Sequence, residues 1–255
     1  MVVTASVSFA GLFPICAVAQ RSTIVVFDSL VPVGGVPSHR ARIALLEEQL
    51  LTRPRDYGLR WLAAQEYAQI GLTEPDSKTR FRLWSRSRLH ATVAKTLDPD
   101  GLEGRYWLAV AAGLIADLSG GRTKVRLADE AYRESAWVLE IDSTHAGAHY
   151  LQGRIQAAVM RLSAVMRFIA KALAGGDALR SASWERAEFH LRRAAELEPE
   201  LAMHHFELAM AYESMDRPEE MHLALLNAVG ASVSTSFQED FKARARHLLG
   251  ESRRP

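Results

Sequence analysis

The sequence predicts an all-α fold, a solenoid of helical hairpins, from three observations. Ala, Leu, Arg and Glu dominate the composition, and all four are strong helix formers. The few Gly and Pro residues gather where apolar-periodic runs stop. Four of these runs end alike and recur along the chain, as the units of a repeat protein do. With 255 residues and 48% apolar side chains, the chain can bury one large repeat array.

The ends of the four runs lie at matched distances. They are the segments Leu50–Pro54, Thr96–Asp100, Glu140–Ser143 and Glu196–Glu200. From Pro54 the equivalent positions Pro99, Ser143 and Pro199 follow after 45, 44 and 56 residues. Because Pro stops a helix, each unit is expected to close one helix and open the next.

Three residue columns follow these ends at constant spacing. An aromatic residue recurs at Trp61, Tyr106, Tyr150 and Phe206. A small residue follows three positions later, at Ala64, Ala109, Gly153 and Ala209. An Arg or His directly precedes each aromatic, at Arg60, Arg105, His149 and His205. In a hairpin array the small residue lets two helices approach closely, and the large residues fill the space between hairpins.

The last unit carries the clearest pattern. The helix from His205 to Tyr212, the turn at Asp216–Pro218 and the run Met221–Ala228 resemble a tetratricopeptide repeat, with Leu, a small residue and Tyr in the first helix and Ala in the second. The typical period is about 34 residues. The longer spacing here predicts a tetratricopeptide-like helical hairpin solenoid with elongated, insertion-bearing repeats.

The insertions resemble those of the regulator of microtubule dynamics family and its bacterial relatives. The matching elements are the Gly-Gly-basic-Thr-Lys turn at Gly120–Arg126, Gly153-Arg154 before a long helix, the turn Gly175-Gly176, and the helix start Ser183–Glu185. The resemblance covers roughly residues 90 to 250. It implies a tetratricopeptide-like fold and a binding role, while microtubule and mitochondrial associations belong to the eukaryotic members.

The domain organisation is expected to have three parts. Residues 1–19 have the composition of a signal peptide, since Met1 to Gln20 lacks charge and Ala17-Val18-Ala19 suits cleavage. A flexible linker, 20–38, includes a Pro- and Gly-rich stretch. The helical repeat domain fills 39–255. A periplasmic or secreted location follows from the signal peptide, and an uncleaved apolar tail is the alternative.

Ten helices are expected in the repeat domain. Their ranges are 39–52, 57–71, 77–96, 102–118, 124–141, 146–173, 183–197, 201–215, 218–229 and 237–249. The last helix begins at a capping box, Ser236–Glu239, and its polar face suits the end of an array.

The aromatic column is the candidate binding site. In the tetratricopeptide fold this position tends to line the concave groove, and aromatic and Arg side chains are the usual anchors of interfaces. The expected groove residues are Arg60, Trp61, Arg105, Tyr106, His149, Tyr150, Arg154, His205, Phe206 and Met210. The alternative is that the aromatics only pack between hairpins.

Several functions are disfavoured. With 31 Lys and Arg against 30 Asp and Glu, the chain lacks the basic excess of a nucleic-acid binder. It has no phosphate loop, zinc-protease helix or nucleophile elbow, so no catalytic residue and no cofactor is expected. His145 and His149 have the spacing of a metal pair, but a third ligand is not evident, and no metal is expected.

The sequence therefore predicts a non-enzymatic scaffold that binds a peptide or helix of a partner protein in a concave groove. A membrane-peripheral adaptor is the alternative, because the run 157–173 is apolar and basic without an acidic residue. Solenoids rarely enclose a dry pocket with several convergent polar groups, which argues against an enzyme.

Overall fold

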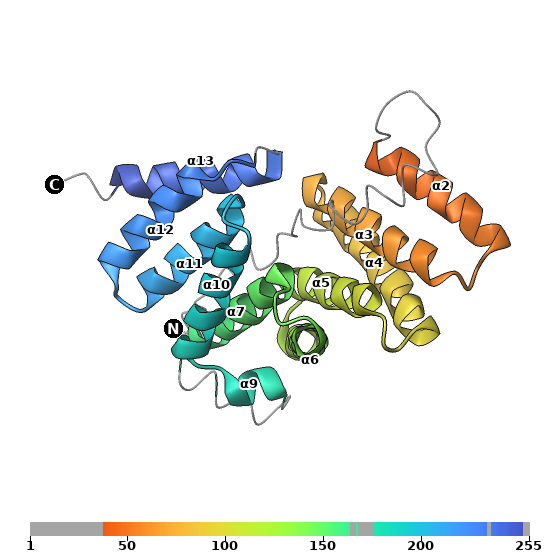
Figure 1. Ribbon diagram of the computed structural model, residues 1–255, viewed down its shortest axis with the longest axis horizontal. Coiled ribbons are helices and arrows are strands. Elements are labelled where there is room, and N and C mark those ends of the chain that lie inside the picture. Colours follow the sequence, from red (N-terminus) through yellow and green to blue (C-terminus); the bar gives the residue numbers. More distant parts are fainter. Residues whose placement is uncertain (1–37, 164–166, 168–175, 234–235, 252–255) are drawn as a thin grey trace, which may run out of the picture.

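The computed structural model describes residues 38–163, 167, 176–233 and 236–251, and every regular element within them is an α-helix (Figure 1). The all-α prediction is confirmed. The helices are α2 (His39–Thr52), α3 (Tyr57–Thr73), α4 (Ser77–Leu97), α5 (Leu102–Leu118), α6 (Gly121–Ile141), α7 (Ala146–Met160), α9 (Asp177–Ser181), α10 (Trp184–Leu197), α11 (Ala202–Ser214), α12 (Pro218–Gly230) and α13 (Ser236–Glu251).

The helices form four hairpins in a curved array (Figure 1). The hairpins are α3 with α4, α5 with α6, α7 with α10, and α11 with α12. Helix α2 packs against α3 at one end, and α13 packs against α12 and α11 at the other. The short α9 lies between α7 and α10 in the chain and packs against α6 and α7. The array is therefore a solenoid of the expected kind, with one inserted helix.

The turn before each first helix of a hairpin is built in the same way in all four units. One backbone hydrogen bond, 3.2 Å long in every case, closes it. The N–H groups of Asp56, Gly101, His145 and Leu201 donate to the carbonyl oxygens of Arg53, Asp98, Asp142 and Glu198. These positions repeat with the spacing seen in the sequence, so the structure confirms the alignment of the units.

Helix α7 is shorter than predicted. The sequence predicts one helix over 146–173, but α7 ends at Met160, and the N–H of Leu162 donates to the carbonyl of Val159 in a tight turn. Ala157, Ala158 and Val159 are buried. The first residues of the basic run 157–173 are thus buried in α7, and residues 164–166 and 168–173 of it lie outside the described residues. No helix in the described ranges is both long and apolar enough to cross a membrane.

The turn before α9 requires glycine. Gly176 has φ of 131°, where L side chains are strained, and a Cβ there would lie 2.6 Å from Oδ1 of Asp129. The expected signal peptide and almost all of the expected linker lie outside the described residues. The first described residue, Ser38, caps α2 by accepting a hydrogen bond from the N–H of Ala41 at 3.3 Å.

All four residues of the small-residue column are buried. Its members are Ala64, Ala109, Gly153 and Ala209. At Gly153 the two helices of the hairpin lie very close together, because a Cβ on it would lie 2.6 Å from Cγ of Leu191 and 2.9 Å from the backbone nitrogen of Leu191 on α10. The backbones of α7 and α10 therefore approach as closely as glycine allows.

Replacing Gly153 with Ala is expected to lower the free energy of unfolding by about 1–3 kcal/mol, because overpacking forces α7 and α10 apart. Gly230→Ala is the matched control, since a Cβ there meets nothing within 4 Å. The control should be neutral or slightly stabilising, because Ala favours a helix over Gly. Urea denaturation of both variants measures the difference. Equal stability of the two variants would show that the close approach at Gly153 does not constrain the hairpin.

Candidate functional site

The aromatic column lies mostly inside the array. Tyr106, Tyr150 and Phe206 expose only 3%, 1% and 1% of their surface, whereas Trp61 is half-buried. The Phe206 ring packs edge-on against Phe241 of α13, 5.4 Å away between centroids. Three of the four rings therefore do not face water. Their burial supports the packing alternative that the sequence left open.

The tyrosines of this column link neighbouring hairpins. The hydroxyl of Tyr106 lies against Gly147 at the start of α7, where a Cβ would collide with it. The Tyr150 ring packs beside His204 of α11, with ring centroids 5.2 Å apart. The aromatic positions recur because each hairpin must contact the next one.

The column of Arg and His residues has a structural role that the sequence analysis did not assign. Each side chain donates to the carbonyl oxygen six residues earlier, in the turn that opens its unit. The contacts are Arg60 Nε to Pro54 (3.0 Å), Arg105 Nε to Pro99 (2.8 Å), His149 Nε2 to Ser143 (3.1 Å) and His205 Nε2 to Pro199 (2.9 Å). The constant six-residue spacing was visible in the sequence and is the signal for this contact.

Three of these side chains also contact the second helix of their hairpin. Arg60 Nη1 lies 3.3 Å from Nδ1 of His90, and Nδ1 of His149 lies 2.9 Å from Nδ1 of His190. Arg105 bonds Oε2 of Glu134 at 3.0 Å. The column thus joins both helices of a hairpin to its turn.

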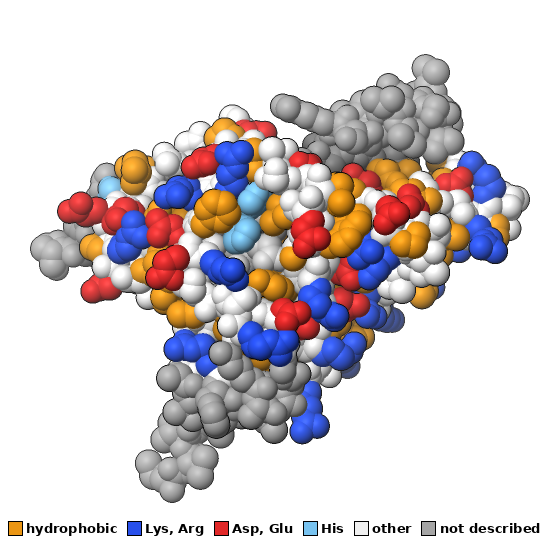
Figure 2. Space-filling view, turned by 60° about the horizontal axis from the view of Figure 1, so that its bottom comes forward, with side chains coloured by type: hydrophobic (Ala, Val, Ile, Leu, Met, Phe, Trp, Pro, Cys, Tyr) orange, Lys and Arg blue, Asp and Glu red, His pale blue; other side chains and the backbone are white. Residues whose placement is uncertain are grey.

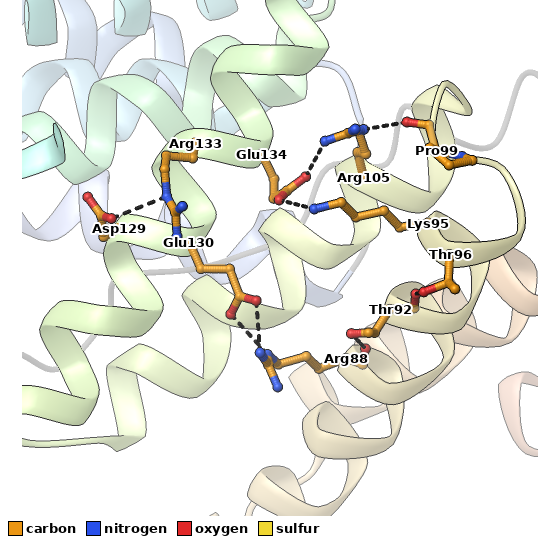
Figure 3. A network of polar contacts seen from close by, with 10 residues as sticks. All are labelled: Arg88, Thr92, Lys95, Thr96, Pro99, Arg105, Asp129, Glu130, Arg133 and Glu134. Atoms are coloured by element: carbon orange, nitrogen blue, oxygen red, sulfur yellow. Dashed lines mark hydrogen bonds and ion pairs between the residues drawn. The ribbon is translucent and has the colours of Figure 1, made fainter. Parts of the chain in front are cut away.

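The centre of this network lies between α4, α5 and α6 (Figure 3). Glu134 accepts from both Arg105 and Lys95, so one carboxylate links the three helices. Arg88 forms a two-pronged contact with Glu130, at 3.0 and 2.8 Å, which joins α4 to α6. The Arg105 guanidinium also lies 4.0 Å from the centroid of the Trp137 ring. The Arg105 guanidinium thus makes its contacts within the protein.

Arg154 is buried rather than aimed at a groove. Its Nε lies 3.3 Å from Oε2 of Glu207, and its Nη1 donates to the Tyr150 hydroxyl at 3.0 Å. Burial lowers the pKa of Arg154, but Glu207, Tyr150 and Asp117 together outweigh burial and keep that pKa raised. Among the expected groove residues, Arg60, Trp61, Arg105 and Met210 are half-buried, and the others are buried.

A different set of apolar side chains reaches the surface. Leu89, Phe189 and Leu223 expose 60%, 52% and 60% of their surface. They occupy one repeat position on the second helices α4, α10 and α12, each two residues before a buried residue: Ala91, Leu191 and Leu225. We call these three residues the outer apolar column. Figure 2 shows a face on which hydrophobic and histidine side chains reach the surface among charged ones.

The two histidines of the candidate metal pair, His145 and His149, have different partners in the structure. Nδ1 of His145 accepts a hydrogen bond from the N–H of Ala148 and caps α7, whereas His149 turns toward His190 on α10. Within the described ranges, no group of three or more His, Cys, Asp or Glu side chains is arranged to hold a metal ion.

Comparison with known proteins agrees with this architecture. The family model described as regulator of microtubule dynamics protein 1-3 matches residues 36–253. A thermophilic tetratricopeptide-repeat protein from Thermus thermophilus superposes with a TM-score of 0.57 at 16% identity, over 90% of this chain and 96% of that one. The structure of MamA gives a TM-score of 0.45 at 13% identity, over 91% of this chain and 99% of that one. No curated protein sequence matches the chain significantly.

Proposed function

Because this chain belongs to the regulator of microtubule dynamics protein 1-3 family, we propose that it is a non-enzymatic scaffold that binds a peptide or helix of a partner protein. The fold supports this proposal, since tetratricopeptide-like arrays offer long continuous surfaces to partners. A family and a fold do not determine which surface binds a partner. The binding surface of this chain follows from its own exposed side chains.

We place the partner against the outer apolar column. The observation that carries this choice is that Leu89, Phe189 and Leu223 share one repeat position and are each more than half exposed. Exposed apolar side chains are ordinary when scattered, but a set in one repeat position presents a row to a single ligand. At the same position α6 carries Arg133, which pairs with Asp129 at 3.2 Å. A partner segment with apolar side chains would thus lie across the second helices.

The groove predicted from the sequence is the competing location. Three of its aromatic rings are buried: Tyr106, Tyr150 and Phe206. The apolar groove residues that reach the surface are Trp61 and Met210. The two locations share no residue. Separate substitutions therefore test them independently.

Changing Leu89, Phe189 and Leu223 together to Ser is expected to weaken partner binding by about tenfold or more, because interface anchors account for most of the binding energy. Exposed substitutions usually change stability little, so the helical signal should remain. The partner would be obtained by cross-linking in the native host, and its affinity would then be measured by calorimetry.

Leu51→Ser is the matched control, because Leu51 is 83% exposed but lies at the end of α2, outside the column. It should bind like the unchanged protein. Loss of affinity in a Trp61→Ala, Met210→Ala variant, with the triple Ser variant unaffected, would instead place the partner in the groove.

A further inference from the structure

Two histidine rings from different helices face each other in the third hairpin. Nδ1 of His149 on α7 lies 2.9 Å from Nδ1 of His190 on α10, and the ring centroids are 5.1 Å apart. The two residues are 41 positions apart in the sequence, so the sequence alone does not reveal that they form a pair. We infer that His149 and His190 form a two-histidine site for a divalent transition metal such as Zn²⁺.

The hydrogen bonds of His149 orient it as a metal ligand. Nε2 of His149 lies 3.1 Å from the carbonyl oxygen of Ser143, and a carbonyl can only accept. Nε2 therefore holds the ring proton, and Nδ1 presents a lone pair toward His190. Metal-bound histidines usually donate their other N–H to such a backbone carbonyl, which fixes the ring and its tautomer.

The spacing of the two nitrogens suits one metal ion. Two Zn–N bonds of about 2.0–2.1 Å at a tetrahedral angle place the nitrogens roughly 3.3 Å apart. The observed 2.9 Å is a hydrogen bond that Nδ1–H of His190 donates to Nδ1 of His149, so metal binding moves that proton to Nε2 of His190 and widens the gap by a few tenths of an ångström. His190 would donate its proton to water from Nε2 when Nδ1 binds the metal. Water or a ligand from another molecule would complete the coordination.

The chemistry of the surroundings favours the neutral ligand form. Burial is the main cause that lowers the pKa of His149 and of His190, which keeps both rings unprotonated near neutral pH. Imidazole nitrogens prefer Zn²⁺, Cu²⁺ and Ni²⁺ to Mg²⁺ or Ca²⁺. The charge of Arg193 acts on His149 and that of Arg186 acts on His190, and both oppose a bound cation. The site should thus bind Zn²⁺ more weakly than a four-ligand structural site does.

Calorimetric titration of the untagged full-length protein with ZnCl₂ tests the site. His190→Gln should weaken the affinity by about tenfold or more, since even the loss of an orienting group costs 10- to 100-fold. His222→Gln is the control, because His222 is an exposed histidine on α12. Its affinity should equal that of the unchanged protein. Equal affinity of His190→Gln and the unchanged protein would overturn the inference.

A second variant keeps the test decisive if His190→Gln does not fold. Arg193→Gln removes a positive charge that acts on His149 and leaves both rings in place. It should tighten Zn²⁺ binding by about threefold, and the gain should shrink at high salt because added ions screen the charge. Unchanged affinity in this variant would contradict a metal at this pair.

Discussion

Replacing Arg154 with Met is expected to lower the free energy of unfolding by about 3–5 kcal/mol, because it removes one partner of the buried Arg154–Glu207 ion pair. The side chains of Arg154 and Glu207 are only 3% and 8% exposed. Without the guanidinium, the Glu207 carboxylate must stay buried without its ion-pair partner or take up a proton. Both outcomes cost stability.

Met is the suitable replacement because it fills most of the space of the Arg side chain without a charge. The substitution also removes the donor to the Tyr150 hydroxyl, so the loss includes that hydrogen bond. Urea denaturation at pH 7, followed by circular dichroism, gives the change. Because the pair joins α7 to α11, the third and fourth hairpins should separate more easily in the variant.

The double variant Arg154→Met, Glu207→Leu separates the ion pair from simple packing. Replacing both charges with apolar groups of similar size is often neutral or stabilising, so the double variant should recover most of the loss. Arg192→Met is a further control, because Arg192 is more than half exposed and its pairs are on the surface. If the double variant were as unstable as the sum of its single variants, the two charges would not interact.

The helix ends were predictable because their signals are local. The predicted ranges 39–52 and 102–118 match α2 and α5 at both ends. At the start of α3, Asp56 accepts a hydrogen bond from the N–H of Leu59, and Pro54 lies just before it. A cap and a stop within a few residues of each other set such a boundary without reference to the rest of the fold.

The end of α7 at Met160 was not predictable, because it has no such local signal. From Ala157 to Leu173 the sequence holds good helix formers and neither Gly nor Pro, so nothing local marks a stop. The short α9 follows the glycine turn, and its packing against α6 and α7 was equally hidden. The position of α9 depends on tertiary contacts, which a propensity argument does not contain.

The sequence did not show which way the repeated side chains point, and this was the main reason why the site could not be predicted. The repeat spacing correctly aligned Tyr106, Tyr150 and Phe206. It does not show which neighbouring helix these side chains contact. The two tyrosine rings face the next hairpin and the Phe206 ring faces α13, and these neighbours lie far along the sequence. The same limit hid the outer apolar column, because Leu89 and Phe189 become exposed only once the packing of α4 and α10 is known.

Lowering the pH from 7 to 5 is expected to destabilise the folded protein through its buried histidines, of which His190 and His204 contribute about 2 kcal/mol each. Burial, aided by the charge of His205, lowers the pKa of His204 to about 3. Burial, aided by His149 and Arg186, lowers the pKa of His190 to about 4. Both values lie below the ordinary value of 6.5 that the unfolded chain retains.

The direction follows from where the protons bind. Between pH 6.5 and about 4 the unfolded chain takes up protons on both histidines while the folded chain does not, so acid favours unfolding in this range. The stabilisation is fully present above pH 6.5. Glu103 acts in the opposite direction, because burial raises the pKa of its carboxyl and acid relieves that cost.

His204→Asn tests the cause, because an Asn amide can still donate to the carbonyl of Ala194, which the His204 Nδ1 contacts at 3.0 Å. The variant has one buried titrating group fewer, so its loss of stability between pH 7 and 5 should be smaller by about 2 kcal/mol. Urea denaturation at pH 7, 6 and 5 measures that loss for both proteins. An equal loss in both would mean that a buried neutral ring at His204 is not the source of the acid sensitivity. A smaller loss would link the packing of His204 against Tyr150 directly to the pH range in which the array stays folded.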